Sequence, residues 1–582
     1  MKSYLPAPYP ILPIPEILAL CATALFLCRS NWTGAFAYEF SSLLAVASFL
    51  VFAIGTVVRL SAIEDARPLT SADRVRAAFG SFLSLWAPLV MVLLASIRIP
   101  TCRYGVGFVW FLLLPVPSAL FGAASGIWAT TLRTTSVKRA FAALLPALAF
   151  CLLTAWELYL GPGLSFLNPA IGYFAGPIYD EWIPIRTPIV TYRIFTLFLS
   201  LILIVTATRR SDLVRFGSAF AVATLLILRG PLGWSHDQQT LDRALPARLS
   251  GRTVELHFAP SSFSFQRAYS LLRTLDDRAD RIASEIGLNA RERSQAILIY
   301  LYPNPATKYR LTGVRHTAIG NPIRRTVHLL ASESLEFVTH EMVHVVAGPL
   351  GVPGLRLSLR VGLLEGLATG VQRYQDDLSV HEWARAMQKL NLLPSMAKMM
   401  KPTGFWGESA GRAYLAAGSF CRWLLDSRGA YLFQRVYRGA DFGETYRVPL
   451  ASLVEQWEQF LRTVPLSAGA VRIADSHLRA KPVTERRCPH DVADAVERGY
   501  GCWGRKDLPG AIGFFGEAWR YSGEIPSTTL RLARAEARSR NWVRVEELAR
   551  LILSKTESST SERASARALL GDSAAVRGNL VA

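Results

Sequence analysis

Histidine is scarce in this chain, with nine residues among 582, and none of the nine lies within residues 1–232. That absence excludes a histidine-ligated metal site from the first two fifths of the chain. The residue spacings of zinc fingers, RNA-recognition motifs and helix-turn-helix proteins are also lacking. A nucleic-acid partner is therefore not expected, although the formal net charge is +20.

Acidic residues are few, 44 against 64 Lys and Arg. Of the basic residues, 17 lie within residues 1–232, mostly between long apolar runs, where such charges orient a membrane protein. A basic surface beside anionic lipid accounts for the remainder. The composition therefore indicates a lipid bilayer as partner.

Long apolar runs are confined to residues 1–232 and predict an all-α transmembrane bundle of about seven helices. Most runs approach the roughly 20 residues needed to cross the hydrocarbon layer, while the first and last are short. A cleaved signal peptide is not expected, because six apolar segments follow the first and no small-residue cleavage site stands out. The predicted segments are Ile11–Cys28, Phe40–Val58, Ala77–Ile97, Gly105–Thr131, Phe141–Leu160, Val190–Ala207 and Val214–Leu228.

Lys and Arg alternate between the two sets of connections. The richer set is predicted to lie in the cytoplasm, so that seven crossings place everything after about residue 230 outside it; the placement inverts if the seventh segment does not cross. The richer set has eleven (Lys2, Arg59, Arg67, Arg74, Arg76, Arg133, Lys138, Arg139, Arg209, Arg210 and Arg215) and the poorer set six (Arg29, Arg98, Arg103, Arg186, Arg193 and Arg229). Glu39 and Glu157 are either part of a transport path or interfacial carboxylates at segment ends.

The rest of the chain has the pattern of a soluble protein and divides into two further predicted domains, 233–465 and 485–582. The first has strand patterns at "VELHFA" (254–259) and "AILIYLY" (296–302), followed mostly by helices, which indicates an α+β fold. The second is all helical, and "ERGYGCWGRKDLPGAIGFFGEAW" (497–519) resembles one tetratricopeptide-type repeat. Helical hairpins of this kind can bind a partner protein.

The stretch "SLEFVTHEMVHVVAG" (334–348) contains the most specific motif of the chain. On a helix, His340 and His344 share one face, so their neutral imidazoles can bind one metal ion. Glu341 points to the side and can accept a proton from water activated by that ion. With so few histidines, chance alone gives this pattern roughly once in a hundred such chains.

A third ligand is predicted 21 positions after His344, at Glu365 in "VGLLEGLATG" (361–370). A carboxylate flanked by leucines on an apolar helix is costly to bury without a partner, and a metal supplies one. Gly366 and Gly370 permit close packing of this helix. The alternative is an exposed glutamate at a solvent-facing edge.

His340, Glu341, His344 and Glu365, followed by "EGLA", together resemble the gluzincin metallopeptidases over about residues 250–465. The resemblance implies one Zn²⁺ per chain, held by the two histidines and Glu365, with Glu341 as general base. It also implies an edge strand that pairs with extended peptide, for which "TVHLL" (326–330) is in the right place.

Three further features of the sequence bear on this resemblance. Tyr414, in "GRAYLAAGSFCRWLLDSRG" (411–429), is either a donor to the oxyanion, as a tyrosine is in several relatives, or a core residue. The motif with which the aminopeptidases grip a free N-terminus is absent, and "TAIGNPIRR" (317–325) is basic instead, which favours an endopeptidase. Thr369 stands where thermolysin-like enzymes have an acid, so the groups around the ligands are expected to differ from theirs.

The function expected is that of a membrane-anchored zinc endopeptidase acting on protein or peptide substrates. The expected location is a bacterial inner membrane, with the peptidase and C-terminal domains periplasmic. One alternative is a non-catalytic receptor or assembly scaffold that binds peptides, and another is a transporter with an accessory peptidase domain. An intramembrane metalloprotease is excluded, because the motif lies more than a hundred residues past the last apolar segment.

Of seven cysteines, Cys488 and Cys502 are the pair that an oxidising compartment would suggest. If both lie on one helix, their 14-residue separation spans about 21 Å, which no disulfide can bridge. We therefore expect no bond between them. Cys421 is expected to be a small buried apolar residue.

Overall fold

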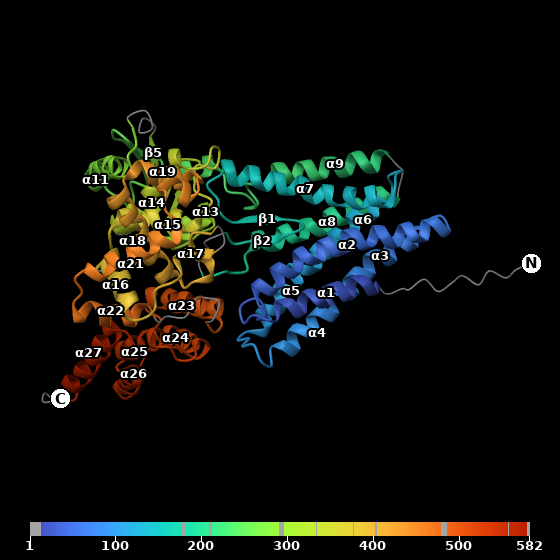
Figure 1. The fold of residues 1–582 in the computed structure, drawn as a ribbon. Helices are drawn as coiled ribbons and strands as arrows, with labels where there is room; N and C mark the ends of the chain where they lie inside the picture. The colour runs from blue at the N-terminus through green and yellow to red at the C-terminus, as the bar shows by residue number, and fades with distance from the viewer. Residues whose placement is uncertain are drawn as a thin grey trace, which may run out of the picture. The chain divides into compact units, whose positions relative to one another are not determined.

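The computed structural model describes residues 13–176, 181–208, 212–289, 296–332, 335–375, 378–401, 404–478, 486–556 and 558–578. Lys2, Arg209 and Arg210 lie outside these ranges, as does the side chain of Arg215. The chain forms two compact units, and Figure 1 labels most of their helices and some of their strands. The first consists of Met1–Gln238, Leu311–Val314 and Thr484–Asp494; the second consists of Gln239–Arg310, Arg315–Val483 and Ala495–Ala582.

Five helical spans among the described residues are long and apolar enough to cross a membrane. Two shorter apolar helices, Ile14–Leu27 and Phe216–Ile227, correspond to the first and last predicted segments. Sequence and structure therefore agree on seven apolar helices, of which the terminal two are short. The five long spans are Tyr38–Ala66, Ser71–Ala95, Tyr104–Ala129, Ser136–Leu160 and Thr187–Thr208.

The first unit is built around α6, which lies against both α2 and α8. Small residues on α6 allow this close approach: a Cβ added to Gly122 would lie 2.4 Å from the carbonyl oxygen of Phe49 on α2. The helices are α1 (Ile14–Leu27), α2 (Tyr38–Ala66), α3 (Ser71–Ser84), α4 (Trp86–Ala95), α5 (Tyr104–Leu113), α6 (Pro115–Ala129), α7 (Ser136–Leu160), α8 (Thr187–Thr208) and α9 (Asp212–Ile227), with a hairpin of β1 (Phe166–Asn168) and β2 (Gly172–Phe174).

Arg193 was expected among the connections, and that expectation is wrong: it is a buried residue of α8. Its guanidinium donates to the carbonyl oxygens of Leu113 at 2.7 Å and Leu114 at 2.9 Å, and to the hydroxyl of Ser118 at 2.7 Å. These acceptors sit where α5 gives way to α6 and backbone carbonyls are left over. Arg193 therefore ties α8 to this junction and is not a topology charge.

The carboxylates in or near the apolar helices have cationic partners. Glu16 lies 2.6 Å from Arg59, and Glu157 lies 2.9 Å from Arg229. Glu39 pairs with His490. Pairing of this kind is what buried carboxylates need in an apolar setting, and it gives Glu39 and Glu157 a structural role.

The second unit contains a five-stranded sheet of order β3-β4-β5-β7-β6. The inner strands β4, β5 and β7 are parallel, whereas β3 and β6 are antiparallel edges. One sheet face carries the alternating Val, Leu and Ile side chains, which pack with α11 and α14 in the main core. The strands are β3 (Ala247–Ser250), β4 (Val254–Phe258), β5 (Ile297–Tyr302), β6 (Ile319–Asn321) and β7 (Thr326–Leu330).

The remaining elements of this unit are mostly helices, as the sequence predicts. They begin with α10 (Gln238–Ala244), α11 (Phe265–Glu285), α13 (Pro305–Thr312), α14 (Leu335–Val346), η1 (Gly348–Leu350) and α15 (Val361–Gln372). After the short pair β8 (Tyr374–Gln375) and β9 (Leu378–Ser379) follow α16 (Val380–Lys389), α17 (Met396–Met399), η2 (Gly404–Gly407), α18 (Ala410–Arg428), α19 (Ala430–Arg438), α20 (Phe442–Tyr446), α21 (Leu450–Thr463) and α22 (Ala468–Leu478).

The C-terminal helices pack on their neighbours in sequence, α24 on α25, α25 on α26 and α26 on α27. Gly499 marks a close approach, because a Cβ there would lie 2.6 Å from the Phe515 ring. Ala511 and Ala518 are buried at the same junction. The helices are α23 (Pro489–Gly504), α24 (Leu508–Ser522), α25 (Pro526–Arg538), α26 (Trp542–Ser554) and α27 (Thr560–Val576).

Candidate metal centre

Two consecutive helices, α14 and α15, bring the predicted ligands together. His340 and His344 lie one turn apart on α14, and Glu365 lies on α15, which packs against it. Single ligand atoms of the three side chains all lie within 4.8 Å of one another. The spacing read from the sequence therefore corresponds to one compact cluster.

The glycines of α15 place Glu365 by letting the helix approach α18 closely. A Cβ added to Gly366 would lie 2.6 Å from the Cys421 sulfur, and one added to Gly370 would lie 2.7 Å from the Gly418 carbonyl oxygen. Only a helix without side chains at these positions can sit this close to α18. Cys421 is buried at this contact, as expected from the sequence.

The separations within the cluster suit a small tetrahedral cation. Nε2 of His340 lies 3.2 Å from Oε2 of Glu365, and Nε2 of His344 lies 3.4 Å from the same oxygen. Ligands about 2.0–2.1 Å from a tetrahedral ion are themselves roughly 3.3 Å apart. Two imidazoles and a carboxylate are also a donor set that zinc accepts, so the residues present fit that ion.

The cluster is buried and strongly coupled. The side chains of His340, His344 and Glu365 are 13%, 10% and 7% exposed. Burial acts to raise the pKa of Glu365, but His344 and His340 outweigh it and hold that pKa well below the usual range. Burial acts to lower the pKa of His344, but the Glu365 carboxylate, with Glu341, raises it to about 8. Glu365 is thus an ionised carboxylate in a buried site that draws positive charge to it.

Glu341 and Tyr414 lie beside the cluster and remain partly exposed. The Tyr414 ring, on α18, is centred 6.0 Å from the His340 ring and packs edge-on against Phe405 at 5.2 Å. Burial raises the pKa of Tyr414, and the carboxylates of Glu365 and Glu341 raise it further. The hydroxyl therefore keeps its proton and is able to donate a hydrogen bond.

The expectation that "TVHLL" (326–330) is an edge strand is wrong. That segment is β7, which pairs with β5 on one side and with β6 on the other. The edge is β6 (Ile319–Asn321), a three-residue strand within the "TAIGNPIRR" stretch, for which the sequence pattern predicts no strand. A strand this short carries no periodicity, and its one sequence signal was a glycine just before a turn.

Gly320 sets how closely β6 approaches the metal helix. A Cβ there would lie 2.3 Å from the carbonyl oxygen of Glu341 and 3.2 Å from Cβ of His344. Among the described residues no strand pairs with the outer side of β6, so this edge of the sheet runs past the candidate centre, where extended peptide could pair with it.

The Gly320→Ala variant should lose stability, because its methyl group forces β6 away from α14. Overpacking of this kind costs about 1–3 kcal/mol. Thermal unfolding of the purified chain measures the loss. Gly407→Ala is the matched control, since a Cβ at Gly407 meets no atom within 4 Å. Unfolding of Gly320→Ala at the temperature of the parent would show that the contact is not tight.

Thr369, four positions after Glu365, does not orient a ligand. It is buried, its Cγ2 would lie 2.6 Å from a Cβ at Gly418 of α18, and its hydroxyl has no hydrogen-bond partner in the described part of the chain. This position therefore serves the packing of α15 on α18 and not the orientation of a ligand.

Comparisons with known proteins add no assignment. A scan against protein-family models, a search of curated proteins and a search of solved structures each return no match. The functional argument therefore rests on the chain's own residues: three converging ligand groups, a neighbouring carboxylate, a neutral tyrosine and a free sheet edge.

Proposed function

We propose that this chain is a membrane-anchored, zinc-dependent endopeptidase of the gluzincin type. The observation that carries the proposal is the convergence of His340, His344 and Glu365 at separations of 3.2 and 3.4 Å, with Glu341 next to the first ligand. When bound, zinc supplies a Lewis acid that polarises a peptide carbonyl and makes water acidic enough to attack it.

The chain's own groups supply the other requirements of peptide hydrolysis. Glu341, which is not one of the three ligands, accepts the proton of the attacking water and can pass it to the leaving amine. Tyr414 donates a hydrogen bond to the carbonyl oxygen as negative charge develops on it. The main chain of β6 pairs with extended substrate and holds the scissile bond beside these groups.

The apolar helices support a membrane location for this activity. Five spans that could cross a bilayer precede the candidate centre in the chain, so the centre would be anchored to the membrane. With the Lys- and Arg-rich connections in the cytoplasm, the second unit lies outside, in the periplasm of a bacterial cell.

Cleavage of an unstructured protein by the purified full-length chain tests the proposal. Incubation with β-casein should give new peptides whose amino termini map to internal bonds. 1,10-Phenanthroline should abolish the cleavage and added zinc should restore it. A chain that binds zinc but leaves all such substrates intact would contradict the proposal and favour the non-catalytic peptide-binding alternative.

Tyr414→Phe should lower kcat by about 10²-fold, since one oxyanion donor is typically worth 10²–10³. KM and zinc content should not change, because the phenol is not a ligand. The control is Tyr431→Phe, whose ring is 72% exposed on α19. An unaltered kcat in Tyr414→Phe would mean that this tyrosine serves only packing.

A further inference from the structure

A segment far along the chain, residues 486–494, belongs to the unit of apolar helices. Cys488 forms a disulfide with Cys102, across 386 positions of sequence. Cys102 lies in the connection between α4 and α5. Cys21, Cys28, Cys151, Cys421 and Cys502 are free thiols.

Polar contacts of His490 and Asp494 hold the same segment. His490 joins the carboxylate of Glu39, in the first turn of α2, to the main-chain carbonyl of Glu181. Asp494 accepts from Arg103 at 2.5 Å and from the Trp182 indole at 3.1 Å.

Arg486 pairs with the Glu181 side chain at 2.7 Å. The segment therefore contacts α2, the α4–α5 connection and the α7–α8 connection at once. We name residues 486–494 the latch.

The electrostatics of the latch are those of a buried ion pair. Burial acts to lower the pKa of His490, but the Glu39 carboxylate and the Glu181 carbonyl outweigh it and raise that pKa. The neighbouring Asp491 has a pKa raised by burial to about 6, against the opposing charge of Arg103. His490 thus links α2 to the connection between α7 and α8 through one buried imidazole.

The connections of the helix unit sort into two ends. At the latch end, the amide of Phe36 donates to Thr101 at 3.3 Å, and the Tyr38 hydroxyl donates to the Tyr173 carbonyl at 3.0 Å. This end also includes Arg229, because Glu157 at the end of α7 binds it.

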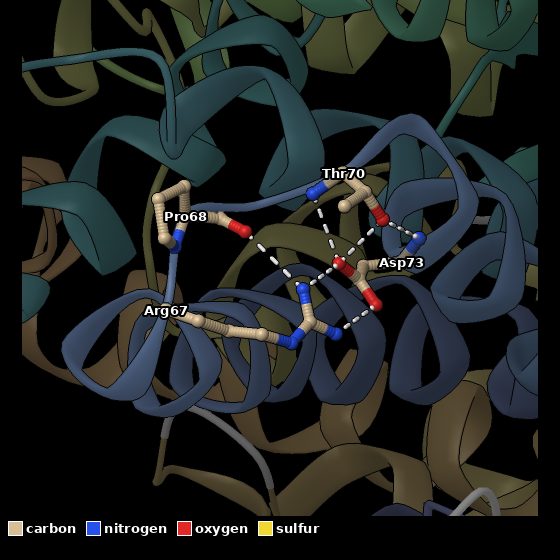
Figure 2. Close-up of polar contacts among 4 residues, drawn as sticks. All are labelled: Arg67, Pro68, Thr70 and Asp73. Atoms are coloured by element: carbon tan, nitrogen blue, oxygen red, sulfur yellow. Dashed lines mark hydrogen bonds and ion pairs between the residues drawn. The ribbon is translucent and has the colours of Figure 1, made fainter. Parts of the chain in front are cut away.

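At the opposite end, a different polar cluster joins the end of α2 to the start of α3, as Figure 2 shows. Arg67 makes two bonds to Asp73, at 2.7 and 2.8 Å, and Thr70 and Asp73 cap the start of α3 reciprocally. Arg67 and Arg133 lie in the connections at this end, and Arg74, Arg76, Lys138 and Arg139 lie near the starts of α3 and α7. They belong to the set that the positive-inside rule assigns to the cytoplasm.

We propose that the latch is closed covalently outside the cytoplasm, where a protein thiol–disulfide oxidoreductase joins Cys102 to Cys488. In this exchange the two thiols lose two electrons and two protons as their S–S bond forms. The disulfide of the oxidoreductase accepts the two electrons and the two protons and becomes a dithiol. Such bonds persist in oxidising compartments and are rare in the cytosol.

The position of the latch also bears on how many times the chain crosses the membrane. The described residues between α9 and Cys488 contain no apolar helix of membrane length, and Arg229 and the latch, both in the first unit, lie at the same end of the helices. The α6–α7 connection lies at the end of the helix unit opposite the latch. Helix α8 runs from the latch end back to this opposite end. The short helix α9 must therefore cross, returning the chain to the latch side.

Counting free thiols in cells tests the closure of the latch. Cells producing the full chain are precipitated with acid and denatured, and the free thiols are coupled to a maleimide–polyethylene glycol before or after reduction. We expect five additions before reduction and seven after it. Cys102→Ser should couple all its remaining cysteines without reduction. The control Cys502→Ser, which removes a free thiol, should still gain two additions upon reduction.

Orientation is tested on membrane vesicles with an impermeant phosphine and an impermeant maleimide. The peptide containing Cys488 should be labelled in right-side-out vesicles and protected in inside-out ones. Seven additions before reduction, or labelling of Cys488 only from the cytoplasmic face, would overturn the proposal. The latch does not involve the metal centre, so its failure would leave the proposed peptidase activity untouched.

Discussion

Peptide hydrolysis by Glu341→Gln is expected to fall by about 10³-fold, within the 10²–10⁴ that a positioned general base contributes. Glutamine has the size of glutamate but cannot take up the proton of the attacking water. Because Glu341 is not one of the three converging ligands, bound zinc should stay at the level of the parent chain. The comparison needs kcat and metal content measured on the same preparation.

The control for this variant is Glu455→Gln, a change of the same kind on the exposed surface of α21. It should leave both quantities unchanged. Full activity in Glu341→Gln would show that another group takes the proton, and loss of zinc in the same variant would show that Glu341 is a ligand.

Loss of a residue that only orients a metal ligand typically lowers metal affinity by roughly 10–100-fold. Glu365→Ala removes a proposed ligand itself, so it is expected to weaken zinc binding far more than this. The variant removes the one carboxylate whose oxygen lies within 3.4 Å of both imidazoles. It also leaves His340 and His344 without their anionic partner, and breaking a buried ion pair costs about 3–5 kcal/mol. The metal-free variant should therefore unfold at a lower temperature than the metal-free parent.

Glu365→Gln separates these two effects. It keeps the volume of the side chain and removes its charge, so zinc affinity should fall while packing against α18 is preserved. Glu455→Ala is the matched control for metal content. Zinc affinity equal to that of the parent in both Glu365 variants would exclude Glu365 from the ligand set.

The sequence predicted the helices well because their patterns are long. Apolar runs of about 20 residues and amphipathic periods over 10 or more residues are strong signals. The predicted segment Phe40–Val58 lies within α2 (Tyr38–Ala66), and Phe141–Leu160 lies within α7 (Ser136–Leu160). The structure also brings His340, His344 and Glu365 together; that they bind zinc remains a prediction.

The sequence could not predict features that depend on contacts between distant segments. The edge strand β6 has three residues, and the turn after it passes through Arg325 at φ 58°, a conformation with no clear signal in this residue. The partner of Cys488 lies 386 positions away, so the local argument about Cys502 could not find it. The burial of Arg193 could not be predicted, because the carbonyl groups that accept its hydrogen bonds come from the distant α5–α6 junction.

The zinc content of the intact chain tests the central claim most directly. The full-length protein, purified in detergent, is equilibrated with zinc, freed of unbound metal and analysed by mass spectrometry for elements. The account predicts about one zinc per chain in the parent. A parent chain without zinc after this treatment would contradict it, and α14 would then be a helix whose two histidines are held by a buried glutamate alone.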